Sequence, residues 1–343
     1  MKKIFIIFSL WLSSAALMAC SAGEDDSSPT PMPQPSAESI SIESELSVAA
    51  VSGTYQVNVT CNATSLSAIP SYSWVEASVS PIVNSKAVLT IKVNQESAEV
   101  TEITSPEGYH LVWHDEFNEG VVLGSDWTHE VKPAGWVNHE LQTYVDGEIA
   151  GRRVTELVDG KLRINCFKQG GIPYSGRVYA KVNEGWTYGY IEARIQLPVG
   201  KGTWPAFWMM PVHFRSWPAD GEIDIMEEVG ANANYVSSSL HANAHVHSNN
   251  TQVTHEMKCA TAESDFHVYA IKWTHENITT YVDGEVQLTY DNRGLGRDDW
   301  PYDDPFYVIL NLAWGGDWGG YKGVDDSALP ATMKIDYIRV FQK

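Results

Sequence analysis

Near its middle the chain carries the stretch Gly221-Glu222-Ile223-Asp224-Ile225-Met226-Glu227-Glu228. Side chains of a regular strand alternate between its two faces, so Glu222 and Asp224 share one face and the isoleucines beside them point to the core. Glu227 returns to the acidic face only if a β-bulge near Ile225-Met226 absorbs one residue. The stretch therefore predicts a bulged strand with three carboxyls on one face, from which Glu228 points away.

Crowded carboxyls suit acid–base chemistry, because like charges disfavour joint ionisation and raise at least one pKa. A retaining glycosidase needs two carboxyls about 5 Å apart, one ionised and one protonated. The alternative is an acidic strand that simply faces solvent. Trp204 and Trp208 lie just upstream and favour the first interpretation, since sugar rings bind against flat aromatic faces. Core packing remains an alternative for either tryptophan.

Outward from this stretch, residues 109–343 show repeated strand-like runs and almost no helical periodicity. Examples are the runs 161–165, 190–195 and 333–340, which Gly, Asp, Asn and Pro separate from their neighbours. Many short strands with such turns predict an all-β sandwich or barrel. Residues 39–103 alternate polar and apolar positions in shorter runs, which predicts a separate small β-sandwich in front of the larger domain.

The N-terminus has the features of a secretion signal. Residues 1–20 combine Lys2 and Lys3, an apolar stretch and a small-residue end at Cys20, which predicts a lipoprotein signal peptide with Cys20 as the acylated residue. Residues 21–38 are rich in Ser, Pro and acidic residues, so they predict a stiff, solvated linker. The acidic triplet 24–26 resembles the surface-export tag of outer-membrane lipoproteins. We expect an outer-membrane protein exposed at the cell surface.

The composition of the chain limits the classes of partner that it can bind. The chain has 343 residues, a net charge of -20 and 13 tryptophans. Such acidity argues against nucleic acid as a partner and suits a neutral polysaccharide. We expect the protein to be a monomer. Besides Cys20, the cysteines are Cys61, Cys166 and Cys259, so at least one has no partner within the chain. A bridge from Cys166 to Cys259 is compatible with the sequence.

Several blocks then carry a resemblance that covers residues 109–342. They are 113–117 (WHDEF), 138–144 (NHELQTY), 188–194 (YGYIEAR), 200–208 (GKGTWPAFW) and 305–313 (PFYVILNLA). With the spacing Glu-x-Asp-x-x-Glu, these blocks resemble the laminarinase-like glycoside hydrolases of family 16. The resemblance implies a β-jelly roll of two curved antiparallel sheets, an open cleft and endo-cleavage with retention. Residues 39–103 resemble, loosely, the BACON modules that precede carbohydrate enzymes.

The resemblance also implies roles for individual residues. Glu222 would be the nucleophile and Glu227 the acid/base, with Asp224 tuning both. Matching positions suggest sugar contacts, and His241 is expected near the acid/base on a neighbouring strand. The expected sugar contacts are Asn138, Gln142, Arg177, Trp204, Trp208 and His241.

The same family often binds a structural calcium, for which Glu116, Gly160 and Asp336 lie at the matching positions. Oxygen ligands fit such a hard cation. No cofactor is expected for catalysis. One departure is Asp220, where many laminarinases have a cysteine; a further charge there would change subsite preference or the pH optimum.

The family signature does not fix the linkage. A β-1,3-glucan such as laminarin and a mixed-linkage β-1,3/1,4-glucan both remain candidate substrates. Agarase and other galactan hydrolases share the bulged spacing, and a minor alternative is transglycosylation of cell-wall glucans. A non-catalytic glucan-binding protein is disfavoured, because all three acids are present.

Overall fold

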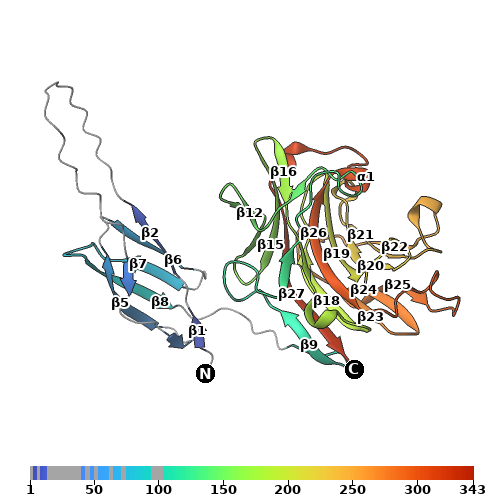
Figure 1. Ribbon diagram of the computed structural model, residues 1–343, viewed down its shortest axis with the longest axis horizontal. Helices are drawn as coiled ribbons and strands as arrows, with labels where there is room; N and C mark the ends of the chain where they lie inside the picture. Colours follow the sequence, from blue (N-terminus) through green and yellow to red (C-terminus); the bar gives the residue numbers. More distant parts are fainter. Residues whose placement is uncertain are drawn as a thin grey trace. The chain divides into compact units, whose positions relative to one another are not determined.

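The computed structural model describes residues 3–5, 8–13, 40–42, 47–49, 53–61, 65–70, 75–93 and 103–343. The chain divides into two compact units, Met1–Thr101 and Glu102–Lys343. Figure 1 colours them from blue at the N-terminus to red at the C-terminus. Among the described residues, no helix has the length and apolar character needed to cross a membrane.

The first unit consists of short antiparallel strands. Its main sheet has the order β3 (Ile40–Ile42), β5 (Gly53–Cys61), β8 (Lys86–Val93) and β7 (Val75–Val79), and two further pairs join β1 (Lys3–Phe5) to β4 (Ser47–Ala49) and β2 (Phe8–Ser13) to β6 (Ser65–Pro70). On β8 the apolar side chains Ala87, Leu89 and Ile91 are buried at every second position, so one face of this sheet forms a small core. The predicted linker 21–38 and Cys20 lie outside the described residues.

The second unit contains a seven-stranded antiparallel sheet. Its order is β10 (Trp127–His129), β17 (Arg177–Ala180), β26 (Phe306–Trp314), β19 (Thr203–Pro211), β20 (Glu222–Glu227), β21 (Tyr235–His241) and β22 (Val253–Lys258). The acidic stretch forms β20, which lies between β19 and β21 in the interior of the sheet. Backbone hydrogen bonds on both sides therefore hold the carboxyl-bearing strand in place.

The partner sheet has ten strands. Its order is β11 (Thr143–Tyr144), β16 (Ile172–Ser175), β15 (Leu162–Gln169), β27 (Ala331–Gln342), β18 (Gly189–Gln196), β23 (His267–Trp273), β24 (Asn277–Val282) and β25 (Glu285–Asp291), with β14 (Thr155–Leu157) on β15 and β9 (His110–Asp115) on β27. Outside the sheets lie the hairpin β12 (Glu148–Ile149) and β13 (Arg152–Arg153), the short helix α1 (Gly316–Gly319) and the 3-10 turns η1 (Val182–Glu184), η2 (Gly230–Asn232), η3 (His247–Asn249) and η4 (Asp326–Ala328).

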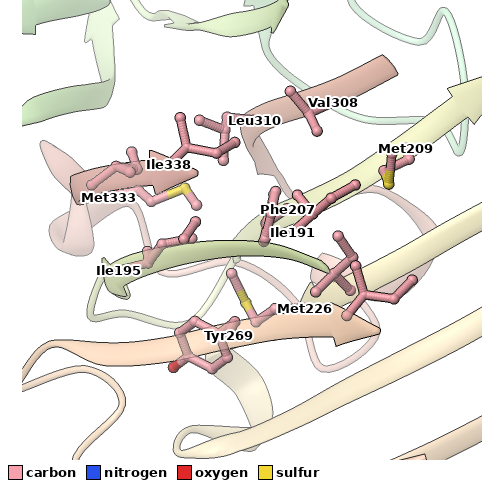
Figure 2. Packing of buried hydrophobic residues seen from close by; sticks show 14 of the residues in the cluster. Ile191, Ile195, Phe207, Met209, Met226, Tyr269, Val308, Leu310, Met333 and Ile338 are labelled. Carbon is pink, nitrogen blue, oxygen red and sulfur yellow. The ribbon is translucent and has the colours of Figure 1, made fainter. Parts of the chain in front are cut away.

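The core lies between these two sheets. Phe207 and Met209 of β19 and Met226 of β20 are fully buried there, against Ile191 of β18 and Ile338 of β27. Figure 2 shows these side chains meeting from strands of both sheets. Because alternate residues of β19 and β20 enter this core, the residues between them face away from it. The predicted all-β jelly-roll sandwich is confirmed.

The cysteines do not form the bridge that the sequence allowed. Cys166 lies on β15 and Cys259 directly after β22, and both are buried free thiols. Burial raises the pKa of Cys166 to about 12 and also raises the pKa of Cys259. Both residues therefore act as small apolar side chains, since the reactive form of cysteine is the thiolate.

Candidate active site

The predicted bulge is present in β20. Against β19, Met226 pairs with Phe207 and Asp224 with Trp208, so Ile225 has no partner of its own. Against β21, the register shifts between Asp224 and Glu227. Ile225 and Met226 are both fully buried. The extra residue thus restores the parity of the strand and brings Glu227 to the side of Glu222 and Asp224.

Both tryptophans of β19 lie on this same side, which we call the polar face of the seven-stranded sheet; it carries Glu222, Asp224 and Glu227. Trp204 Nε1 donates to Glu227 Oε1 at 3.0 Å, and Trp208 Nε1 donates to Asn311 Oδ1 at 2.7 Å. Each indole is partly exposed. Core packing, the alternative left open for either tryptophan, is therefore wrong for both.

The three carboxyls of β20 have little solvent around them. Asp224 is 3% exposed, and Glu222 and Glu227 are partly buried. Burial raises the pKa of each group to about 8, and the charge of Asp224 adds to this shift for Glu222 and Glu227. His241 and Arg177 act in the opposite direction on Glu222. At neutral pH the cluster therefore retains protons that isolated carboxyls would have lost.

His241 lies on β21 as expected, but beside different carboxyls. It pairs with Glu222 across the strands, and its Nε2 lies 3.1 Å from Asp224 Oδ2 and 3.8 Å from Glu222 Oε1. The expectation that it would lie near the acid/base Glu227 is wrong, because the antiparallel register places it at the other end of β20. Its Nδ1 is buried and has no hydrogen-bond partner among the described residues.

Arg177 lies on β17, which β26 and β19 separate from β20 in the sheet. Its Nε donates to Glu130 Oε2 at 2.6 Å, and its guanidinium lies 5.0 Å from the ring centre of Trp136 and 4.6 Å from that of Trp208. The side chain is 8% exposed. A cation held by one carboxylate between two aromatic faces is rigid, so Arg177 presents a fixed positive charge on the polar face.

The block of residues 138–144 forms a network around a fourth buried carboxyl, that of Glu140. Gln142 Nε2 donates to Glu140 Oε2 at 2.7 Å, Tyr144 OH at 3.3 Å, and Asn138 Nδ2 donates to Oε1 at 3.3 Å. Gln142 Oε1 accepts from the backbone N–H of Trp314 at 2.7 Å, and Gln142 is only 1% exposed. The expected sugar contact by Gln142 is therefore wrong, because both ends of its amide are already bonded. Asn138 is exposed.

Sequence reasoning assigned no role to Glu140, Glu130, Trp136 or Asn311. Glu140 and Asn311 lie within blocks that carried the resemblance. Asn138 and His139 lie in a turn with left-handed backbone, so strand alternation gives no signal for the contacts of Glu140. Asn311 lies opposite Ala206, which lies opposite Glu227, so its place on the polar face follows only from the strand register.

The two other acids of the central segment are engaged away from the polar face. Glu228 is fully buried, as its parity predicted, and its Oε1 accepts the backbone N–H of Asn234 at 2.6 Å. Asp220 is 2% exposed, and Arg215 binds its Oδ1 at 2.8 Å. The further charge expected at Asp220 is therefore buried and paired with Arg215 and Arg297.

The carboxylates expected to bind calcium are occupied by cationic side chains. Glu116 accepts from Arg339 Nε at 2.9 Å and from Nη2 at 2.8 Å. Asp336 accepts from Arg194 Nη1 at 2.7 Å, and Lys161 Nζ lies 3.5 Å away. As arranged, this donor set with the Gly160 carbonyl does not fit a calcium ion, which needs six to eight free oxygen ligands.

Among the described residues, one group of three acid or histidine side chains has its ligand atoms within 4.8 Å of one another, namely Glu222, Asp224 and His241. These are the groups already bonded on the polar face.

Comparisons with known proteins agree with this geometry. The family model "Glycosyl hydrolases family 16" matches residues 158–339. The beta-glucanase of Rhodothermus marinus is 42% identical over 250 residues, which cover 68% of this chain and 85% of that protein. The structure of the laminarinase from Rhodothermus marinus has 40% identity and a TM-score of 0.64, and the match covers 68% of this chain and 97% of that one.

A mutant of SCLam, a non-specific endo-beta-1,3(4)-glucanase co-crystallised with 1,3-beta-D-cellotriosyl-glucose, has 38% identity and a TM-score of 0.65; the match covers 70% of this chain and 97% of that one. The bulged acidic strand lies within the residues that the family model matches. The chain belongs to family 16 of the glycosyl hydrolases.

Proposed function

We propose that this protein is a retaining endo-β-glucanase that hydrolyses β-1,3-glucan, mixed-linkage β-1,3/1,4-glucan or both. The observation that carries the proposal is the bulge in β20, which brings Glu222, Asp224 and Glu227 to one face of the sheet. Two carboxyls that flank a scissile glycosidic bond can act as nucleophile and acid. The related glucanases support the substrate class.

In the first step, the Glu222 carboxylate attacks the anomeric carbon while Glu227 gives its proton to the glycosidic oxygen, and the leaving sugar departs. Burial raises the pKa of both Glu222 and Glu227 to about 8, so each can hold a proton at neutral pH. His241 favours the ionised form of both glutamates, and Arg177 adds to this effect at Glu222. The order of the two roles follows the family spacing Glu-x-Asp-x-x-Glu, in which Glu227 holds the proton that the leaving group needs.

In the second step, Glu227 takes a proton from water, and the resulting oxygen nucleophile breaks the glycosyl ester to Glu222. The configuration at the anomeric carbon is retained after two inversions. Asp224 lies between the two glutamates, and its charge raises the pKa of both. It therefore keeps a proton within the cluster through both steps, while His241 holds it in place at 3.1 Å.

The polar face supplies surfaces for sugar rings beside these acids. Trp204 and Trp208 are partly exposed and hydrogen-bonded at their indole nitrogens, so their orientation is fixed. Arg177 and Asn138 add polar groups for sugar hydroxyls. Aromatic faces with a few fixed polar groups are typical of carbohydrate sites.

The roles of the two glutamates can be separated by chemical rescue. Glu222→Ala and Glu227→Ala should each lose activity on laminarin. With azide present, azide takes the place of the missing Glu222 carboxylate and gives the α-glycosyl azide, whereas the Glu227→Ala variant gives the β-glycosyl azide from its covalent intermediate. NMR of the products distinguishes the two anomers. Identical products, or full activity in either variant, would overturn the assignment.

Product sizing decides the linkage. The protein is incubated with laminarin, barley β-glucan, lichenan and agarose, and the oligosaccharides are resolved by size. We expect internal cleavage of laminarin or of the mixed-linkage glucans and none of agarose, with water as the acceptor. Release of galactan fragments would contradict the proposal.

We also propose that the protein is a monomeric lipoprotein at the surface of the outer membrane, anchored at Cys20, with residues 39–103 as a spacer or weak glucan binder. The signal-like residues 1–20 and the acidic linker 21–38 support this. Cys20→Ser should move the protein from the membrane fraction to the soluble fraction. Unchanged membrane association in this variant would contradict the anchor.

A further inference from the structure

Asp220 is a buried anion whose two oxygens are both fully bonded. Oδ2 accepts the backbone N–H groups of Arg215 at 2.7 Å and of Ser216 at 2.9 Å. Oδ1 accepts from Arg215 Nη2 at 2.8 Å and from Arg297 Nη2 at 3.2 Å. Hydrogen bonds from Arg215 hold the pKa of Asp220 well below its usual range. The carboxylate thus stays ionised and fastens its own loop.

This loop, residues 215–221, is closed into a compact turn. The Asp220 N–H donates to the Ser216 carbonyl at 3.1 Å, and the Gly221 N–H donates to the Pro218 carbonyl at 3.0 Å. Trp217 lies in the turn and is 43% exposed. An exposed tryptophan would otherwise sample several rotamers, so the closed turn limits where its ring can lie.

The ring of Trp217 lies against the imidazole of His241. Their ring centres are 5.7 Å apart, and Trp217 also lies 5.8 Å from His247, whose ring is 5.9 Å from that of His241. His241 makes one close side-chain contact, to Asp224 at 3.1 Å, and its Nδ1 has no partner among the described residues. One polar contact fixes a point but not the ring plane, so packing by the neighbouring rings must orient this imidazole.

A second connection from Asp220 to His241 runs through Arg297 and contacts the His241 backbone. Because Arg297 belongs to the segment 297–304, its bond to Asp220 at 3.2 Å ties the 215–221 loop to that segment. Within the segment, Arg297 Nη2 also donates to Asp304 Oδ2 at 2.7 Å. In that segment Tyr302 OH donates to the backbone carbonyl of His241 at 2.9 Å. The same carboxylate therefore joins the loop that packs on the His241 ring to the segment that binds the His241 backbone.

We propose that Asp220 is a positioning residue, which fixes the 215–221 loop and thereby holds Trp217 against His241 and the imidazole against Asp224. This inference rests on the proposed function, since it concerns the orientation of a group beside the reacting carboxyls. Small displacements of such groups reduce the rate without removing any catalytic atom. Asp220 is thus a specific requirement for turnover and not only for loop stability.

A double-mutant cycle with Trp217 tests the inference. Asp220→Asn keeps the size of the side chain and removes the charge that binds both arginines. We expect kcat on laminarin to fall roughly three- to tenfold and KM to change less, with the pH profile shifted. In the Trp217→Ala background the same substitution should have a smaller effect on kcat, because one of the two paths from Asp220 to His241 is already broken.

A purely structural role gives a different result. Asp220→Asn would then lower the melting temperature equally in both backgrounds and leave kcat of the folded protein unchanged, or the two kcat losses would multiply. Either outcome overturns the inference. Asp304→Asn is the matched control, because it removes the other partner of Arg297 and leaves every bond to Asp220 in place. We expect its kcat to equal that of the wild type.

Arg297→Gln is a second variant in case Asp220→Asn folds poorly. Arg297 is partly exposed and supplies one of the four bonds to Asp220, so the loop should survive with a smaller loss of kcat. Unchanged kcat in the Arg297→Gln variant would overturn the inference even if Asp220→Asn does not fold. A wild-type protein inactive on every glucan would instead overturn the proposed function, so the two failures are distinguishable.

Discussion

Acidic side chains lie on both sheets of the second unit, but in opposite electrostatic settings. On the seven-stranded sheet, His241 lies 3.1 Å from Asp224 and 3.8 Å from Glu222, and burial raises the pKa of Glu222, Asp224 and Glu227 to about 8. On the ten-stranded sheet, Arg339 binds Glu116 at 2.8 Å and Arg194 binds Asp336 at 2.7 Å. The carboxyls of β20 have no arginine bound to them, so they hold protons that catalysis can use. The carboxylates of the ten-stranded sheet form ion pairs with arginines and thereby connect strands.

The largest effect on activity should come from Asp224, the middle one of the three β20 carboxyls. Asp224→Asn removes a charge that raises the pKa of Glu222 and Glu227. Both pKa values should fall, so the base limb and the acid limb of the pH–rate profile should both move to lower pH. We expect kcat/KM at neutral pH to fall on the order of 10³-fold, within the range for loss of acid–base support. Activity measured from pH 4 to 9 checks this.

The matching control for that variant is Glu192→Gln on the ten-stranded sheet. Glu192 lies 3.7 Å from Arg339 and is also partly buried. Its replacement should leave the pH–rate profile unchanged. If Asp224→Asn also left the pH–rate profile unchanged, the β20 carboxyls would not have the proton-holding role that we assign to them.

Disrupting the ion pairs of the ten-stranded sheet should lower the stability of the protein and leave its catalytic rate unchanged. Arg339 is 4% exposed, so Arg339→Met leaves the Glu116 and Glu192 carboxylates without their cation in a largely buried setting. Breaking a buried ion pair from one side costs about 3 kcal/mol, somewhat less here because Glu116 retains some solvent. Urea denaturation should show this loss, with kcat of the folded enzyme unchanged. A loss of kcat without a loss of stability would contradict the contrast between the two sheets.

Glu228 lies at the end of the catalytic strand but on its core side, and it should give a pH-dependent effect. Its folded-state pKa of about 8 lies above that of an unfolded glutamate, so the native state prefers the protonated form. The stability it contributes is present at low pH and is lost as the pH rises from about 4.5 to 8, by up to about 1.4 kcal/mol per pH unit. Glu228→Gln should remove this loss.

Melting temperatures of both proteins from pH 5 to 8 test the effect of Glu228. The melting temperature of Glu228→Gln should increase relative to that of the wild type as the pH rises. Glu256→Gln is the control, because Glu256 is an exposed carboxyl that bonds Asn232 of the neighbouring turn at 2.9 Å. Curves for wild type and Glu228→Gln that run parallel would show that Glu228 is not protonated in the native state.

The sequence was sufficient for the parts of the site that depend on short-range order. The parity break between Asp224 and Glu227 predicts the bulge, and the blocks around it predict the sandwich. It also predicts that Glu228 points away, because alternation along a strand needs no knowledge of other strands.

Partners far apart in the chain could not be inferred in this way. Glu116 and Arg339 are 223 residues apart, and Asp336 and Arg194 are 142 apart, so nothing local indicates that arginines occupy the expected calcium ligands. Likewise the position of His241 beside Glu222 depends on the register of two strands, and the burial of Gln142 depends on the backbone of Trp314. Composition and spacing do not determine register.

The smallest expected effect is that of removing calcium. Because arginines already neutralise Glu116 and Asp336, a chelator should leave the melting temperature within about 1 °C of that in buffer alone, and added calcium should not raise it. A bound ion would instead stabilise the native state in proportion to the logarithm of its concentration. Arg339→Met sharpens the test, since it frees both oxygens of Glu116. Calcium that stabilised only this variant would show that the arginine occupies a cation site, whereas calcium that stabilised the wild type would restore the site expected at Glu116, Gly160 and Asp336.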